Sequence, residues 1–231
     1  MASDHYFEYC VAFNNETAAT GFSNYTVLDI SANYHIFSDN PVVGGCLAAE
    51  LNVSLLKPST TIPRMAKVRP YVRVTNGTTS SEWVPQGVFY IDTRETTNNN
   101  DGRDILTIHA YDAMLKTEAD YPSTTHSWPT SDINVVKEIA REIGLQSSLN
   151  TTTGLDDRTV SLMNKGYQIG LPAGYSMREV LSNIAAMYGG NWVMNYAGKL
   201  LLVAINGIPP ETNYLIDGTS AITFGGDRIL V

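Results

Sequence analysis

Residues 176–203, "SMREVLSNIAAMYGGNWVMNYAGKLLLV", read as one helix followed by a β-hairpin. Ser176 and Glu179 have the spacing of a capping box, in which each residue binds a free backbone N–H at the helix start. Apolar residues recur at helical spacing and predict one buried stripe: Val180, Leu181, Ile184, Ala185 and Met187 or Tyr188. Gly189-Gly190 is expected to end the helix where a positive φ is required.

The hairpin consists of "NWVMN", the turn "YAGK" and "LLLVA", with Gly198 able to take a left-handed conformation. The stretch contains no nucleophile, metal-ligand cluster or phosphate-binding loop. Its buried stripe needs a sheet to cover, so we interpret the unit as a small α+β module whose residues serve folding.

A second helix is predicted upstream, in "TSDINVVKEIAREIG". Its apolar residues also fall at helical spacing: Ile133, Val136, Ile139, Ala140 and Ile143. Thr130 or Ser131 is the expected N-cap, and Gly144 stands where the helix should stop. A polar loop and a short extended piece, "YQIGLP", follow.

The first half of the chain alternates near period two, as strands do. The predicted strands are residues 6–13, 26–30, 33–37, 47–56, 67–74, 83–92 and 104–111. Turn signals such as Asn76-Gly77 separate them. About seven short strands at this spacing predict a closed barrel or a sandwich. Pro70 and Pro85 lie inside two of these runs and indicate edge positions or bulges.

The composition is that of an ordered protein with an acidic surface. The chain has 231 residues, 43% hydrophobic and 16% charged, and a formal net charge of -8. Nucleic-acid-binding surfaces need clustered Lys and Arg, so this balance argues against one.

The N-terminus, "MASDHYFEYC", has neither the basic nor the apolar region of a signal peptide. No window reaches the roughly 18 apolar residues that span a bilayer. We therefore expect folding in a cytoplasm-like compartment, with Cys10 and Cys46 as reduced, buried thiols.

One arrangement has the chain order of a Cys/His hydrolase: Cys46, then His109, with Asp112 as a possible orienting group. Order without geometry is weak support, and His109 reads more simply as a half-buried strand residue. The acidic pairs Asp156-Asp157 and Glu118/Asp120 read as solvated charges at turns and helix ends.

The four histidines, His5, His35, His109 and His126, show no i,i+4 pairing and no neighbouring Cys, so zinc binding is not expected. We predict no catalytic, cofactor-binding or metal-ligating residue, no cofactor, and no enzyme.

Four blocks in succession resemble the tail hub proteins of tailed bacteriophages and prophages, the baseplate hub or tail-associated family. They are "SEWVPQGVFYIDT", "ILTIHAYDAMLKTEADY", a helix ending in "EIG", and "YSMREVLSNIAAMYGGNWVMNYAGKLLLV". The resemblance runs over roughly residues 25–231 and is strongest in 82–121 and 174–203. The order and spacing of the blocks carry it more than any single block.

The resemblance implies a mainly β fold with an α+β insert. Residues 1–122 would form a tail-tube-like β-barrel, 123–205 the insert, and 206–231 the start of a second, incomplete tube-like barrel. It also implies a homotrimer at the virion tail tip, assembled in the bacterial cytoplasm. The expected partners are the distal tail protein or tube ring and the tape measure protein, with DNA only passing through the channel and no membrane insertion.

The resemblance also implies where charge should lie. A channel that passes DNA should be lined by acidic and neutral polar side chains, because basic ones would hold phosphates. We expect the basic residues of the first barrel to face subunit or tube contacts instead: Arg64, Lys67, Arg69 and Arg73.

Two other classes stay open. One is a tail-associated cell-wall hydrolase, which would need a catalytic constellation or a further domain. The other is a carbohydrate-binding adhesion module, which would need Trp83, Trp128 and Trp192 exposed in a groove. Trp192 is predicted to be core and Trp128 to be the more exposed ring.

Overall fold

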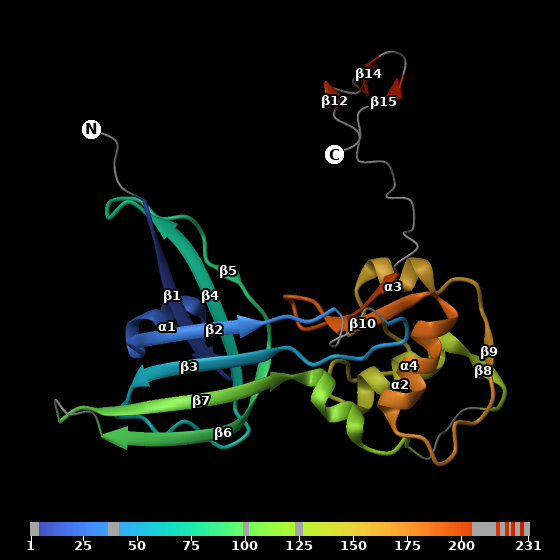
Figure 1. Ribbon diagram of the computed structural model, residues 1–231, viewed down its shortest axis with the longest axis horizontal. Helices are drawn as coiled ribbons and strands as arrows, with labels where there is room; N and C mark the ends of the chain where they lie inside the picture. The colour runs from blue at the N-terminus through green and yellow to red at the C-terminus, as the bar shows by residue number, and fades with distance from the viewer. Residues whose placement is uncertain are drawn as a thin grey trace.

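The computed structural model describes residues 5–36, 42–98, 102–122 and 127–204, together with four two-residue strands nearer the C-terminus. Those strands form two antiparallel pairs, β12 (Ile216–Asp217) with β13 (Ser220–Ala221) and β14 (Thr223–Phe224) with β15 (Asp227–Arg228). The rest of the predicted second barrel, 206–231, lies outside the described residues. The other described residues form a sheet lobe and a helical lobe, side by side (Figure 1).

The sheet lobe is mainly antiparallel β, as predicted. Its order is β1-β4-β6-β7-β3-β2, and β5 pairs with β4 beyond the residues of β4 that pair with β6. The strand bounds are β1 Tyr6–Phe13, β2 Val27–Asn33, β3 Glu50–Leu56, β4 Lys67–Thr75, β5 Val84–Pro85, β6 Phe89–Asn98 and β7 Asp104–Asp112. No ladder joins β1 to β2 within the described residues, so a closed barrel is not confirmed.

The predicted strand at 83–92 is in fact two strands, β5 and β6. Gly87 separates them with a φ of 140°, and a Cβ there would meet the Phe89 ring. The predicted strand at 33–37 does not form, because β2 already ends at Asn33 and the next described residues are irregular. Residue 37 lies outside the described residues.

The prolines stand where strand pairing changes or ends. Pro70 lies in β4 between the residues that pair with β6 and those that pair with β5. Its carbonyl accepts a hydrogen bond from the N–H of Gln86 at 2.9 Å. Pro85 lies on the two-residue edge strand β5. The prediction of edge positions is therefore confirmed for Pro85, and Pro70 marks a change of partner.

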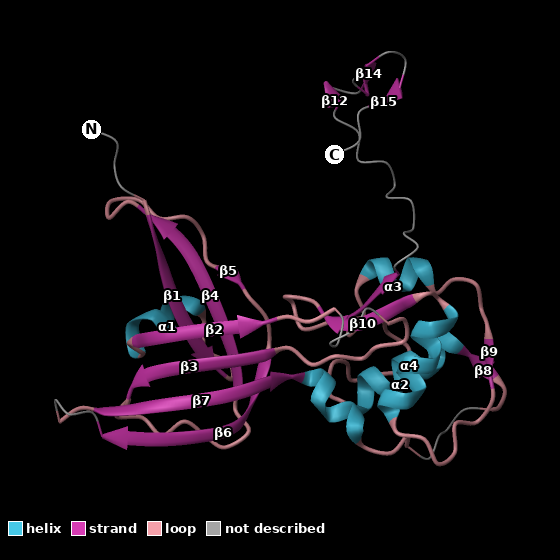
Figure 2. Cartoon of the chain, viewed as in Figure 1, coloured by secondary structure: helices cyan, strands magenta, loops and turns pink. Residues whose placement is uncertain are grey.

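The helical lobe holds both predicted helices, and Figure 2 shows its helices gathered beside the short hairpin. The elements are η1 Ala113–Glu118, β8 Thr130–Ser131, α2 Asp132–Glu142, α3 Asp157–Leu162, β9 Gln168–Ile169, α4 Met177–Met187, β10 Gly190–Met194 and β11 Leu200–Ala204. Three short helices were not predicted: η1, α3, and α1 (Ala18–Asn24), which lies against β1.

The start of α4 is the predicted capping box, with both hydrogen bonds between Ser176 and Glu179 present. The predicted use of both glycines at its end was wrong in part. Gly189 has a positive φ of 64°, whereas Gly190 already belongs to β10. A Cβ at Gly190 would lie 2.5 Å from the carbonyl oxygen of Val203 on β11. Gly190 is therefore required for close strand approach, not for a left-handed turn.

Buried side chains form two clusters. One fills the sheet lobe and includes Leu51, Val68, Phe89 and Ile108. The other fills the helical lobe around α2, α4, β10 and β11, and Trp192 at its centre is fully buried. This second cluster also takes in Cys46, which precedes β3, and Ala113 and Met114, which directly follow β7. The helical lobe is therefore built from two separate stretches of chain, one before β3 and one after β7.

Candidate functional site

The junction between the lobes is held by backbone hydrogen bonds and by side chains that bind backbone groups. Residues 42–49, which lead into β3, run beside β10 of the helical lobe. The N–H of Gly44 donates to the carbonyl of Gly190 at 2.9 Å, and the N–H of Trp192 donates to the carbonyl of Gly45 at 2.8 Å. Cys46 forms a parallel bridge with Trp192. This stretch, called the connector below, therefore adds a third strand-like edge to the β10–β11 hairpin.

Asn191 fixes the connector from the side of the hairpin. Its side chain is buried, and its carbonyl oxygen accepts a hydrogen bond from the N–H of Gly45 at 2.7 Å. Its amide group donates to the carbonyls of Ile36 and Val42, both at 2.9 Å. Three hydrogen bonds from one buried amide satisfy most of its capacity and hold one connector geometry.

Asp112 holds the other crossing between the lobes, where β7 passes into η1. Its carboxylate accepts hydrogen bonds from the backbone N–H groups of Ala49 and Met114, each at 2.9 Å. Burial raises the pKa of Asp112 to about 6, although these two hydrogen bonds and the charge of Arg178 act in the opposite direction. Asp112 thus links the start of η1 to the residue before β3.

Arg178 on α4 holds η1 in place within the helical lobe, next to the junction. Its guanidinium donates to the carbonyl of Met114 at 3.1 Å and pairs with the Glu118 carboxylate at 2.9 Å. A further contact reaches the Thr117 hydroxyl at 3.4 Å. The first strong block of the resemblance, 82–121, supplies η1, and the second, 174–203, supplies α4 and β10. The two blocks therefore contact each other directly in the fold.

The Cys/His/Asp order does not become a catalytic arrangement. The Cys46 thiol lies in the helical core, 3.5 Å from the Ser182 hydroxyl, and burial raises its pKa to about 11. His109 lies on β7, with its Nε2 4.0 Å from the Glu50 carboxylate. Both carboxylate oxygens of Asp112 accept hydrogen bonds from backbone N–H groups. Within the described residues, no hydrogen bond joins these three side chains, and a thiol of raised pKa is a poor nucleophile.

Asp156 is a structural cap and not a solvated turn charge. Its side chain accepts a hydrogen bond from the N–H of Arg158 at 3.0 Å at the start of α3, and it also pairs with the Arg158 guanidinium at 2.9 Å. The Arg158 hydrogen bonds hold the pKa of Asp156 at about 2. Within the described ranges, no group of three His, Cys, Asp or Glu could hold a metal ion. His126 lies outside them.

The three tryptophans do not share a groove. Trp192 is core, as predicted. Trp83 is half-buried beneath Arg73, whose guanidinium lies 4.3 Å from the ring centroid. Trp128 is half-buried against the helical core, with its ring 6.4 Å from that of Tyr121. The predicted exposed position of Trp128 is therefore only partly correct.

Two of the four basic residues expected at subunit contacts are engaged within the chain. Arg73 pairs with Glu8 at 2.7 Å. Arg69 donates to the backbone carbonyl of Asn14. Arg64 is exposed, and Lys67 is half-buried near the Tyr90 ring. Which of them face a channel or another subunit stays a prediction.

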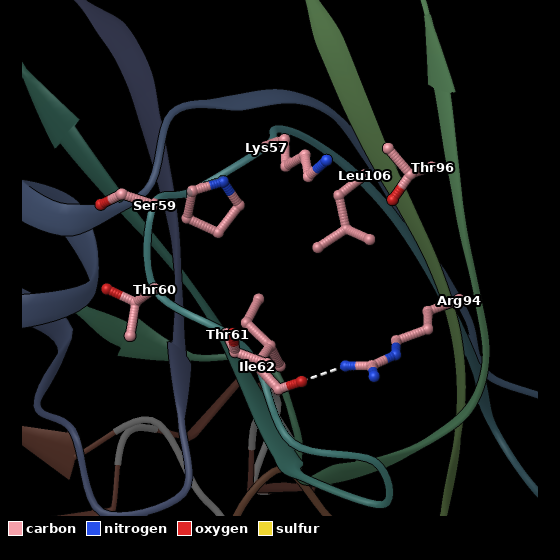
Figure 3. Close-up of a pocket in the computed structure, with 9 residues that line it drawn as sticks. Lys57, Ser59, Thr60, Thr61, Ile62, Arg94, Thr96 and Leu106 are labelled. Atoms are coloured by element: carbon pink, nitrogen blue, oxygen red, sulfur yellow. Dashed lines mark hydrogen bonds between the residues drawn. The ribbon is translucent and has the colours of Figure 1, made fainter.

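A pocket of about 290 Å³ lies at the end of the sheet lobe, between the loop after β3 and strands β6 and β7 (Figure 3). Arg94 reaches across it and donates to the carbonyl of Ile62. Lys57 at its rim pairs with Asp104 at 2.8 Å. Both cations are thus engaged by the chain itself, and Arg94 anchors the loop over the sheet.

None of the helices in the described part of the chain is both long and apolar enough to cross a membrane. No family model matches the sequence, and no curated protein matches it.

Some solved structures are similar to this chain at low sequence identity. The chain is similar to the 43 kDa tail protein of prophage MuSo2 from Shewanella oneidensis, with a TM-score of 0.49 and 8% identity over 84% of this chain and 54% of that one. It is also similar to a tail protein from Neisseria meningitidis MC58, with a TM-score of 0.44 and 10% identity over 85% and 51%. The chain spans about half the length of these two structures, and likeness at this level does not determine function.

Proposed function

We propose that this chain is a structural component of a bacteriophage or prophage tail. In this proposal it acts as the hub at the tail tip, where it closes the tail tube and links it to the tip. The observation that carries the proposal is the contact between η1 and α4. The two sequence blocks that most resemble tail hub proteins meet there, through Arg178, Met114 and Glu118. Because the two similar sequence blocks pack against each other, the similarity concerns one structural unit.

The junction suits a structural component whose function depends on a fixed shape. Asn191, Asp112 and Arg178 each join stretches of chain that are distant in sequence, and all three use hydrogen bonds to backbone groups. Asp112 joins the sheet lobe to the helical lobe through its two backbone partners, and Arg178 holds η1 against α4 within the helical lobe. A ring component that must hold its form while DNA passes needs this kind of fixed junction.

In the assembled tail the chain would be a homotrimer, with 1–122 as a tube-like domain, 123–205 as the insert and 206–231 as the beginning of a second tube-like domain. Its partners would be the distal tail protein or tube ring and the tape measure protein, and DNA would only pass through the channel. The role requires no cofactor, and the chain would be no enzyme.

The test is made in phage particles. An affinity-tagged chain should co-purify with intact virions, and gold-labelled antibody should mark the tip of the tail. Particles from a lysogen that lacks the gene should have defective tails, and the plasmid-borne gene should restore them. Label along the tail tube, label on the head, or normal tails without the gene would contradict the proposal.

A further inference from the structure

A β-bulge in β6 turns Arg94 toward the core side of the sheet lobe. Ile91 lies opposite Ala110 and Arg94 lies opposite Ile108, so β6 carries one extra residue between the two pairs, where the register shifts. Directly opposed residues of antiparallel strands point to the same face of a sheet. Ala110 and Ile108 are both fully buried. Without the extra residue Arg94 would point outward, so the bulge aims its side chain inward.

The core is open to solvent where Arg94 points. Arg94 and Thr96 are exposed, although their β7 partners Ile108 and Leu106 are only 0% and 8% exposed. Strand β4 pairs with only the first two residues of β6 and has left it before Arg94. The loop after β3 faces β6 across the pocket of about 290 Å³ (Figure 3). Two polar side chains on the core face of β6 therefore form a wall of this pocket.

Arg94 keeps most of its hydrogen-bonding capacity free. A guanidinium has several N–H donors in one plane. Within the described residues, Arg94 donates only to the carbonyl of Ile62, which holds the guanidinium across the pocket, and no carboxylate pairs with it. A guanidinium held in this way can bind a planar oxyanion through two parallel hydrogen bonds.

The charge of the pocket favours a ligand with a single negative charge. Lys57 is the other cation in the lining, and its ammonium group pairs with the Asp104 carboxylate at 2.8 Å. That pair is neutral, so Arg94 leaves one net positive charge. A carboxylate carries one negative charge, whereas a phosphate monoester carries about 1.5 to 2 at pH 7. The balance therefore fits a carboxylate better than a phosphate.

The rest of the lining suits a small hydroxylated molecule. The hydroxyl-bearing residues are Ser59, Thr60, Thr61 and Thr96, and the apolar ones are Pro58, Ile62 and Leu106. Thr96 directs its hydroxyl group into the pocket in Figure 3. A hydroxyl group both donates and accepts hydrogen bonds, and the apolar side chains can cover the C–H face of a ring. The volume lies just below the range of about 300–1,000 Å³ typical of drug-sized ligands, which leaves room for one small ring.

We propose that this pocket binds a sugar acid, a hydroxylated ring with one carboxylate. Arg94 holds the carboxylate in two parallel hydrogen bonds, and Thr96 binds a ring hydroxyl beside it. This site goes beyond the structural role in a phage tail and does not depend on it, because the isolated chain in solution is sufficient to test it.

The test is an NMR titration of the full, 15N-labelled chain with D-glucuronate. The amide signals of residues 57, 59–62, 94–96 and 106 should shift and saturate, with a Kd of about 1 mM or tighter. D-glucose lacks the carboxylate, and glucose 6-phosphate carries a more highly charged group in its place. Each should bind at least about tenfold more weakly than D-glucuronate.

Arg94→Gln separates ligand binding from the anchoring of the loop. Gln can still donate a hydrogen bond to the Ile62 carbonyl, but it has neither the charge nor the paired donors that hold a carboxylate. The Kd for D-glucuronate should rise more than about tenfold, without change in far-UV circular dichroism. Arg64→Gln makes the same change at an exposed position outside the lining and should leave the Kd unaltered. Thr96→Val keeps the charge and shape and should raise the Kd about threefold or more.

Absence of saturable shifts at the pocket would overturn the proposal. It would leave Arg94 as an inward-pointing charge that protects the free edge of β6 from pairing with another chain. Equal binding of D-glucose, tighter binding of glucose 6-phosphate, or unchanged binding by Arg94→Gln would each contradict it as well. Should Arg94→Gln not fold, Thr96→Val and the comparison of the three ligands on the wild-type chain decide.

Discussion

The side-chain carbonyl of Asn191 accepts a hydrogen bond from the backbone N–H of Gly45 at 2.7 Å, across 146 positions of sequence. Asn191→Ala removes this acceptor and both donors, so the backbone groups of Gly45, Ile36 and Val42 lose these partners. We expect the free energy of unfolding to fall by about 2–4 kcal/mol. Urea denaturation measures the loss. Asn150→Ala, at an exposed loop position, is the control and should change stability by less than about 0.5 kcal/mol.

The α4 capping box gives a second prediction. The Ser176 hydroxyl accepts a hydrogen bond from the N–H of Glu179 at 3.2 Å, and the Glu179 carboxylate accepts one from the N–H of Ser176 at 2.7 Å. Ser176→Ala should cost about 1 kcal/mol by thermal or urea unfolding. Ser161→Ala, on an exposed helix position outside the cap, serves as control. Equal losses in the two variants would show that the cap adds nothing.

The two glycines after α4 should respond in opposite ways to substitution. Gly190→Ala places a methyl group against the carbonyl of Val203, and overpacking of this kind costs about 1–3 kcal/mol. Gly189→Asn should cost less than about 1 kcal/mol, because Asn tolerates the left-handed region that Gly189 occupies. A larger loss for Gly189→Asn than for Gly190→Ala would refute this assignment of their roles.

Asp112 predicts a pH dependence. Because burial raises its pKa from the ordinary value of 3.8 to about 6 in the folded protein, the folded state binds a proton that the unfolded state has released between those two pH values. Its contribution to stability therefore falls as pH rises from about 4 to about 6 and is constant above that.

The measurement is the difference in unfolding free energy between the wild-type chain and Asp112→Asn from pH 4 to pH 8. Asn does not titrate, so the wild-type advantage should be larger at pH 4 than at pH 7. It should keep a positive value throughout, because the Asn amide group can replace only one of the two acceptor oxygens. An advantage that grows as pH rises from 4 to 6 would mean that the folded-state pKa is lowered.

Local signals explain which elements could be predicted from sequence. The helix after Ser176 has a capping box and a complete apolar stripe, and most sheet strands alternate, so the helix and those strands were predicted within a few residues. The predictions at 33–37 and 83–92 were the exceptions. Helices α1 and α3 were missed, because seven and six residues are too few for an apolar stripe to repeat. Their starts depend on single capping side chains, Thr17 and Asp156.

The contacts at the junction could not be predicted from local sequence patterns. Cys46 and Trp192 lie side by side only because the connector joins the hairpin, and no local pattern at either position contains that information. One signal was present in the sequence. Asn191 is a polar residue in an apolar strand, which indicates a buried amide with non-local partners. The role of Gly190 could not be predicted locally either, because the contact that excludes a side chain there is with the Val203 backbone on another strand.

The central claim is that this chain forms the hub at the tip of a phage tail. The most direct measurement is a cryo-EM map of the tail tip from particles that carry the chain. The account predicts three copies around the channel, with η1 and α4 in contact in each copy and with Arg64 and Lys67 facing away from the lumen. Six copies, one copy, or density for the chain only outside the tip would contradict it.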